Sequence, residues 1–521
     1  MKRTACVVFF LLGSTAFAQL RESVSVEVVQ VPVYVTAQGT AISGLTRDNF
    51  RLFINGKAQS IDYFDRIDFN GLPAGETSDL RQRRLYLLVF DLTFSSANSL
   101  RRAQKAAEKM VDAATPGDTF GIATLTPARG AAVVVPFSQD RPAVVNAVRN
   151  LRLTRLPDPL RLSLTLAERA GIAGGRIVGG GDSLPINAEE AAMGNSERNA
   201  ERDMIEDEIG DLGELAVRLA PLEGVKHVVL LSTGFDSSLI HGVQRRRDLS
   251  DIRQGPLDFR RFSQTADRRN LSLGAALMEA IQRLNETFAR SSVFLDAIDI
   301  GGLRPKQQMA DNESLYALTR GSGGEVVDRR NDLADALTHL TNLQSVVYLL
   351  SFNARNTGRD NNKIVVKLVN APPAARASYR ASYATVVDPP DTSDPLRLAD
   401  IVVNDIPQTG VTTKASVDTA PRKATVNIEV AGGELAAEAN GMTLQGQALI
   451  YIFSGLGAVA FDRKEITIEP QAMTALASRS VRLSQTFDLP PGRYVAKALI
   501  RFGVNDSLGF SRADFTVPAS P

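Results

Sequence analysis

The stretch Leu85-Tyr-Leu-Leu-Val-Phe-Asp91-Leu-Thr93-Phe-Ser95-Ser96 decides the fold of this chain. Its unbroken run of apolar and aromatic residues predicts a strand that is buried on both faces, as in a parallel sheet covered by helices. The strand then delivers one carboxylate and two hydroxyls, those of Asp91, Thr93 and Ser95, to the loop at its carboxyl end. Open α/β sheets bind their ligands at that end of their strands.

These three side chains have two interpretations. A carboxylate and two hydroxyls at positions i, i+2 and i+4 offer the oxygen ligands that a hard cation such as Mg²⁺ prefers. In a purely structural interpretation, the Asp and its hydroxyl neighbours bond the turn and cap the next helix. On these three residues alone, the structural interpretation is favoured.

Strand-like and helical segments alternate on both sides of this loop, from Arg84 to Leu343. Strand patterns are found at 118–125, 131–137, 226–231 and 292–298, and helical patterns at 99–113, 141–150, 188–219, 273–289 and 332–343. Such alternation predicts one mostly parallel α/β sheet that is flanked by helices. Between the last two strands, residues 237–271 are expected to form an irregular, locally basic insertion.

The segments outside this α/β region have β patterns. Residues 24–64 alternate around valine, and Asn55-Gly56 predicts a two-residue hairpin turn. Residues 346–384 hold three more strand-like runs. Neither segment has enough strands for a sandwich alone, so we expect them to pair with each other around the inserted α/β domain. Beyond a proline-rich linker, residues 396–521 are predicted to be a second, wholly β sandwich.

The first residues have the pattern of a secretory signal peptide. Lys2 and Arg3 precede an apolar run, and Ala16-Phe-Ala18 has the small-x-small cleavage pattern. We therefore expect residues 1–18 to be removed and the protein to be exported, either to the periplasm or out of the cell. The only cysteine, Cys6, lies in that segment, so the mature chain would have no disulfide. No later stretch approaches the ~20 apolar residues of a membrane-spanning helix.

The expected organisation has six parts. They are a signal peptide (1–18), a β-rich segment (19–80), an α/β domain (81–345), a β segment (346–384), a linker (385–395) and a C-terminal β-sandwich domain (396–521).

The composition argues against nucleic-acid binding and gives little support to catalysis. The chain has 59 Lys and Arg against 58 Asp and Glu, so no global field attracts nucleic acid. Gly181-Asp-Ser183-Leu matches one esterase signature, but the strand that should precede it and the later Asp-x-x-His are both missing. Because no nucleophile, base and orienting group assemble, we expect a protein that is not an enzyme.

The order of these elements resembles a von Willebrand factor type A (VWA) domain, in the form found in exported bacterial proteins called VWFA-related. The resemblance covers roughly residues 22–384. The segments that carry it are Ser43–Phe50, Leu87–Asp91, Val228–Phe235, Ala297–Leu303 and Ser322–Gly324. It implies a Rossmann-like sheet flanked by helices, with a metal-ion-dependent adhesion site at the strand ends.

In that family the metal is held by an Asp-x-Ser-x-Ser loop, by a Thr on a second loop and by an Asp on a third loop. Asp91, Thr93 and Ser95 match the first loop, with Thr in place of the first Ser. The resemblance thus makes these three residues candidate metal ligands.

The second and third loops match less well. Thr233 stands where the third-loop Asp is expected, and Asp236 follows three residues later. Thr154 and Asp158 are the candidates near the second loop. A cation that has lost part of its hydration shell needs compensating negative charge, and Thr233 removes one full charge. We therefore expect Mg²⁺ or another divalent cation to be held weakly or not at all.

The function expected from the sequence is protein binding, as in adhesion or recognition. The partner would be an unidentified protein that docks on the loops after Asp91, Thr233 and Asp299. One alternative is a structural or scaffold role in the cell envelope, with no ligand at these loops. The other alternative is a serine hydrolase that uses Ser183.

Overall fold

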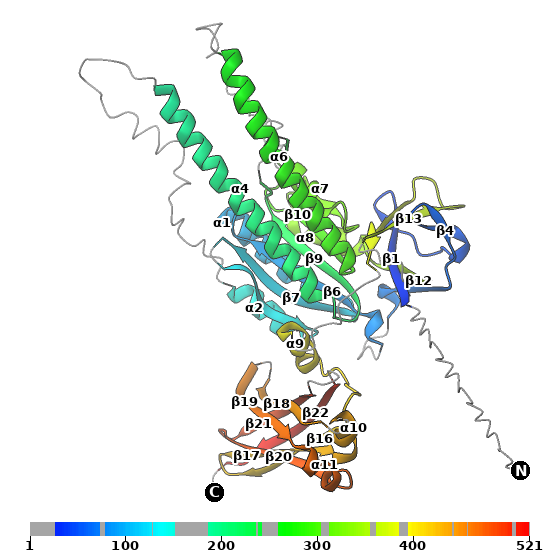
Figure 1. Cartoon of the computed structure of the whole chain (residues 1–521), viewed down its shortest axis with the longest axis vertical. Coiled ribbons are helices and arrows are strands. Elements are labelled where there is room, and N and C mark those ends of the chain that lie inside the picture. Colours follow the sequence, from blue (N-terminus) through cyan, green and yellow to red (C-terminus); the bar gives the residue numbers. More distant parts are fainter. Residues whose placement is uncertain are drawn as a thin grey trace, which may run out of the picture.

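The computed structural model describes residues 27–72, 79–127, 129–151, 186–235, 238–241, 259–303, 312–354, 361–384, 394–439, 442–455, 457–502 and 507–519. Figure 1 shows a central α/β unit, a β unit beside it and a C-terminal unit at one end. The expected signal peptide and Thr154, Asp158, Ser183 and Asp236 lie outside the described residues.

The α/β unit is built on one six-stranded sheet in the order β11-β10-β9-β6-β7-β8. Its strands are β6 (Arg84–Asp91), β7 (Asp118–Thr126), β8 (Gly130–Ser138), β9 (Val225–Ser232), β10 (Val293–Asp299) and β11 (Val326–Val327). Neighbours are parallel, except that β8 runs antiparallel to β7. Numbered along the chain, this is the order 3-2-1-4-5-6 of doubly wound folds, which reverses direction between β6 and β9.

Helices cover both faces of this sheet. On one face lie α4 (Ile186–Leu219), α5 (Ser238–His241), α6 (Phe259–Arg290) and α7 (Asn312–Thr319). On the other lie α1 (Ala97–Asp112), α2 (Arg141–Asn150) and α8 (Leu333–Leu343). Successive side chains of β6 pack alternately into the core on one face of the sheet and the core on the other. Every residue of β6, β9 and β10 is buried. The predicted sheet flanked by helices is therefore present.

The expectation of an irregular segment at 237–271 was wrong at both ends, because α5 occupies Ser238–His241 and α6 begins at Phe259. Residues 259–271 are polar, but they contain neither glycine nor proline to end a helix. Polarity alone does not prevent a helix from continuing.

The β unit combines strands from before and after the α/β unit. Its strands are β1 (Glu27–Ala37), β2 (Thr40–Ala41), β3 (Phe50–Ile54), β4 (Lys57–Gln59), β5 (Tyr63–Asp68), β12 (Val346–Ala354), β13 (Asn362–Leu368), β14 (Arg376–Tyr379) and β15 (Ser382–Tyr383). They form two antiparallel sheets, β14-β1-β12-β5 with β2, and β15-β13-β3-β4, which share one hydrophobic core. β1 pairs with β12, and β3 with β13, so the two expected partners do meet.

Short elements complete this part of the chain. Asn55 and Gly56, with φ of 50° and 79°, form the predicted hairpin turn between β3 and β4. Three 3₁₀ turns lie at Arg47–Asn49, Phe69–Gly71 and Leu80–Gln82.

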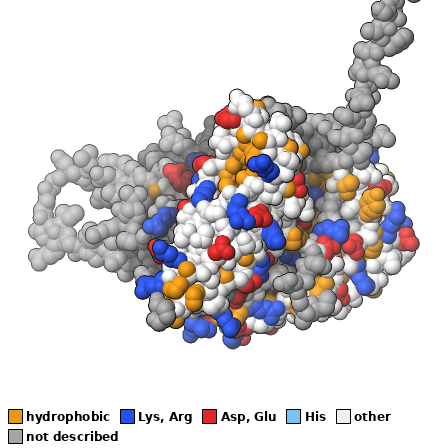
Figure 2. Space-filling model, turned by 90° about the horizontal axis from the view of Figure 1, so that it is seen from below, with side chains coloured by type: hydrophobic (Ala, Val, Ile, Leu, Met, Phe, Trp, Pro, Cys, Tyr) orange, Lys and Arg blue, Asp and Glu red, His pale blue; other side chains and the backbone are white. Residues whose placement is uncertain are grey.

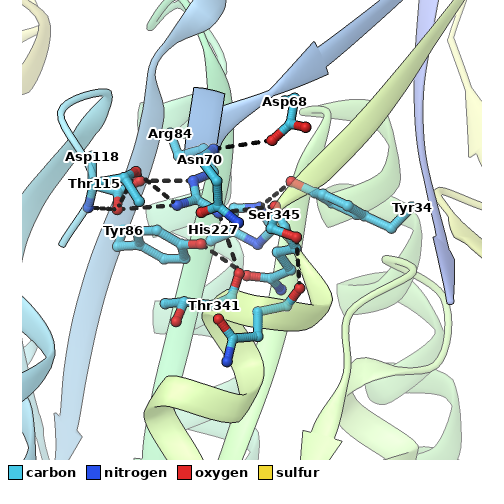
Figure 3. A network of polar contacts seen from close by, with 12 residues as sticks. Tyr34, Asp68, Asn70, Arg84, Tyr86, Thr115, Asp118, His227, Thr341 and Ser345 are labelled. Atoms are coloured by element: carbon cyan, nitrogen blue, oxygen red, sulfur yellow. Dashed lines mark hydrogen bonds and ion pairs between the residues drawn. The ribbon is translucent and has the colours of Figure 1, made fainter. Parts of the chain in front are cut away.

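A buried polar network joins the β unit to the α/β unit (Figure 3). The hydroxyl of Tyr34, on β1, lies 2.8 Å from Nε2 of His227, on β9. Nδ1 of His227 lies 2.7 Å from Oδ2 of Asp296, on β10. Close by, Arg84 donates to both carboxylate oxygens of Asp118, at 2.7 and 3.0 Å. Side chains from both units therefore share one hydrogen-bonded interior.

The C-terminal unit contains two antiparallel sheets, β16-β17-β20 and β19-β18-β21-β22, around a common core. Its strands are β16 (Thr413–Ala420), β17 (Lys423–Ala431), β18 (Leu444–Ser454), β19 (Gly457–Ile468), β20 (Ser480–Asp488), β21 (Gly492–Phe502) and β22 (Ser507–Val517). Basic and acidic side chains are interspersed on the end of the molecule seen in Figure 2, as the balanced composition suggests.

The expectation that residues 396–521 are wholly β was wrong, because three helices are present. They are α9 (Pro395–Val403), α10 (Gly432–Ala439) and α11 (Pro470–Leu476). α9 begins within the predicted linker, where Asp394 caps it by accepting from the Leu396 amide at 2.7 Å and Pro395 occupies the first turn. In the described part of the chain, no helix is long and apolar enough to span a membrane.

Candidate functional site

The candidate site lies where the strand order of the central sheet reverses. β6 and β9 are parallel neighbours, and Phe90 pairs with Leu231, so Asp91 and Ser232 emerge side by side. The Ser232 hydroxyl donates to Oδ2 of Asp91 at 2.6 Å. The carboxyl ends of the strands at such a reversal form the crevice in which doubly wound folds bind ligands.

Asp91 is fully buried and organises its own loop. Its Oδ1 accepts from the amides of Thr93 at 2.7 Å and Phe94 at 3.0 Å. The Ser95 hydroxyl lies 3.4 Å from Oδ2. Helix α1 is capped by Ser96, whose hydroxyl accepts from the Ser99 amide, and not by Ser95. The Ser95 side chain therefore faces the carboxylate.

The loop after β9 is hydrogen-bonded to the Asp91 loop. The Thr233 amide donates to the Ser95 hydroxyl at 3.2 Å, and the Thr233 hydroxyl donates to the Phe94 carbonyl at 3.0 Å. Gly234 has a φ of 73°, which suits the turn, and its amide donates to the Ser232 hydroxyl at 2.9 Å. Thr233 therefore lies against the Asp91 loop, and it contributes no charge there.

The end of β10 completes this edge of the sheet. Asp299 pairs in register with Ser232, and its Oδ1 accepts from the Gly301 amide at 2.8 Å. A few residues on, the side chain of Leu303 is 64% exposed. The loops after β6, β9 and β10 therefore lie along one edge, which offers both buried carboxylates and an exposed apolar side chain.

Glu208, on α4, is a site residue that the sequence did not reveal. It is only 6% exposed and shares a hydrogen bond with the Thr93 side chain. Burial raises the pKa of Glu208 well above its usual range, and the negative charge of Asp91 raises it further. The sequence did contain an indication that Glu208 is buried. It lies three residues after Ile205 and four before Leu212, both of which are in the core, so this helical spacing places Glu208 on the buried face of α4.

The pKa of Asp91 is also raised, chiefly by burial. Hydrogen bonds from Ser232, from the loop amides and from Ser95 act in the opposite direction. Neither Asp91 nor Glu208 takes part in an ion pair with any described basic side chain. The site therefore holds two buried carboxyl groups, and within the described ranges no basic side chain is paired with either of them.

The structure thus brings together some of the predicted site residues. Asp91 and Ser95 are in contact, and Thr93, in the same loop, bonds Glu208. Asp158 and Asp236 lie outside the described residues. Among the residues described, no three His, Cys, Asp or Glu side chains gather in a metal-binding arrangement. A cation at this site would therefore need hydroxyl ligands in addition to carboxylates.

No protein-family model matches this chain, and no curated protein matches it. Among solved structures, it is similar to a von Willebrand factor type A protein from Catenulispora acidiphila, with 11% identity, a TM-score of 0.26, and 88% of this chain and 73% of the other covered. It is also similar to an aerotolerance-related membrane protein from Bacteroides fragilis, with 11% identity, a TM-score of 0.26, and 50% and 98% of the chains covered.

A third similar structure is proximal thread matrix protein 1 from the mussel byssus, described with a zinc-occupied MIDAS motif. It is 12% identical, its TM-score is 0.26, and 56% of this chain and 50% of the other are covered. The strand order and the Asp91 loop of this chain itself define the class: its α/β unit has a VWA-like fold.

Proposed function

We propose that this protein is an exported, non-enzymatic protein-binding protein that recognises its partner through the strand-end loops of the VWA-like unit. The observation that carries this proposal is the convergence of the loops after β6 and β9 at the reversal of strand order. Doubly wound folds place ligands at this position. The flanking β units would hold the recognition edge in position.

A divalent cation at the Asp91 loop would allow this edge to bind a carboxylate of the partner. Asp91 and Ser95 would hold it, and the partner would donate a carboxylate, as in the adhesion chemistry that the resemblance implies. Hard cations accept such mixed sets of carboxylate, hydroxyl and water oxygens. This part of the proposal is supported by Oε2 of Glu208, which is buried beside the loop and has no hydrogen-bond partner among the described residues.

Site-specific photo-crosslinking in the producing cells tests this proposal. A photoreactive residue at Leu303, which is exposed on the strand-end edge, should yield a discrete crosslinked product. The same residue at Asp112, the last residue of α1 at the opposite edge of the sheet, should not. Asp91→Ala should reduce the Leu303 product, because it removes the carboxylate that organises the loop.

The two alternatives predict different results. A scaffold role predicts products from the exposed Phe461 of the C-terminal unit and none from Leu303. A hydrolase predicts that a serine-reactive probe labels Ser183. Equal products from Leu303 and Asp112 would refute recognition by the strand-end edge.

A further inference from the structure

Two facts about Glu208 stand out in the α/β unit. Its Oε2 is buried and, among the described residues, has no hydrogen-bond partner. The groups that act on this carboxyl are Asp91, Thr93 and Asp211, and none of them is basic. A buried carboxylate that is neither paired nor fully hydrogen-bonded is costly, so it requires either a retained proton or a cation.

The surroundings of Glu208 favour a cation. In the Asp91 loop, the Asp91 carboxylate and the Thr93 side chain act on Glu208 directly, and the Ser95 hydroxyl lies 3.4 Å from Oδ2 of Asp91. Two carboxylates with hydroxyls and a few waters are the ligand set that Mg²⁺ and Mn²⁺ take in proteins. A cation would also balance both buried charges at once, which a single retained proton cannot do.

We propose, building on the function proposed above, that Glu208 is the second acidic ligand of a divalent cation at the Asp91 loop. In this site, helix α4, which covers one face of the sheet, supplies a negative charge through Glu208. Thr233, in the loop after β9, supplies none. The site is then complete with Asp91, Thr93, Ser95 and Glu208, and it binds the cation more tightly than the Asp91 loop alone could. Recognition at this edge depends on α4.

Calorimetric titration of the full-length protein with Mn²⁺ and with Mg²⁺ tests this assignment. The wild-type protein should bind one ion. Glu208→Gln keeps the shape of the side chain and removes its charge, and it should weaken Mn²⁺ binding by roughly tenfold or more, as should Asp91→Asn. Glu214→Gln, at an exposed position of the same helix, should change the affinity by less than about twofold.

A rescue variant separates lost charge from lost structure. Thr233 lies against the Asp91 loop, so Thr233→Asp should restore Mn²⁺ binding in the Glu208→Gln background. At the same concentration, Mn²⁺ should raise the thermal unfolding temperature of the wild-type and rescued proteins more than that of Glu208→Gln. Circular dichroism of each variant checks that the fold is retained.

Three outcomes would overturn the assignment. They are no binding of either ion by the wild-type protein, equal binding by wild type and Glu208→Gln, and equal weakening by Glu214→Gln. Each of these leaves the Leu303 crosslinking result standing, so recognition by this edge would survive without Glu208. Conversely, Glu208-dependent Mn²⁺ binding without a Leu303 product would refute only the proposed recognition.

Discussion

At the scale of the residue, burying a single charged group lowers the stability of the α/β unit. Lys226, on β9, is buried, and its ammonium donates to the carbonyls of Ala220 and Leu222 at 3.0 and 3.1 Å. Burial lowers the pKa of Lys226 from 10.5 to about 8, and the nearby charge of Arg380 acts in the same direction. The folded chain thus gives up this proton more readily than the unfolded chain.

The lowered pKa of Lys226 makes the stability of the folded chain depend on pH in one direction. Below about pH 8 both states are protonated and the cost of burying the charge is fully present. Between about 8 and 10.5 the unfolded chain holds the proton that the folded chain has released, so stability rises with pH. Relative to Lys226→Met, the unfolding free energy of the wild type should rise by about 3 kcal/mol across this window. Urea unfolding at several pH values measures this, and a difference that stays constant would contradict it.

At the scale of the element, α9 is held by one buried ion pair. Arg83 donates to both carboxylate oxygens of Asp400, at 3.1 and 3.0 Å, and the two side chains are 1% and 4% exposed. Asn404, just after α9, also donates to the Phe137 carbonyl of β8 at 2.9 Å. The helix therefore bonds the α/β unit directly and packs Leu396 in its core, while Ile401 and Val402 pack on the C-terminal unit.

Breaking this pair should release α9. Asp400→Asn leaves the Arg83 guanidinium buried without its counter-charge, which costs about 3–5 kcal/mol. Amide hydrogen exchange of residues 395–403 should become faster. Glu279→Gln breaks the exposed pair with Arg283 and should cost at most about 1 kcal/mol. Unchanged exchange in α9 of Asp400→Asn would show that the apolar contacts alone hold it.

At the scale of the whole molecule, the β unit and the α/β unit are joined through their interiors. Tyr34 and Val347 of the β unit pack with Val225 and Phe294, at the starts of β9 and β10. The contact between Tyr34 and His227, drawn in Figure 3, crosses the same boundary, and His227 is also bonded to Asp296. We therefore expect the two units to unfold in one transition.

Removing one hydroxyl tests this coupling. Tyr34→Phe leaves the buried Nε2 of His227 without its partner, which should cost about 1–3 kcal/mol. Because the bond crosses the boundary, amide exchange should become faster in β1 and in β9 together. Tyr63→Phe, at an exposed position of β5, should change stability by less than about 0.5 kcal/mol. Faster exchange confined to β1 would argue that the units unfold separately.

The local pattern of apolar and polar residues was sufficient to predict much of the fold. The run before Asp91 predicted a strand buried on both faces, and Asn55-Gly56 predicted its turn, because each depends on neighbours along the chain. α9 was missed because its start, at Asp394 and Pro395, looks like a linker until its apolar face has a surface to cover.

The sequence by itself determined the central sheet and the loop that begins at Asp91, since hydrophobic periodicity and strand-end polarity are local properties. Only the tertiary structure decided what surrounds that loop. Ser232 and Thr233 reach it across the sheet, and Glu208 reaches it from α4. These contacts join residues that are far apart in the chain, and they exist only because strand order and helix packing bring them together. The charge of the site is therefore a property of the fold.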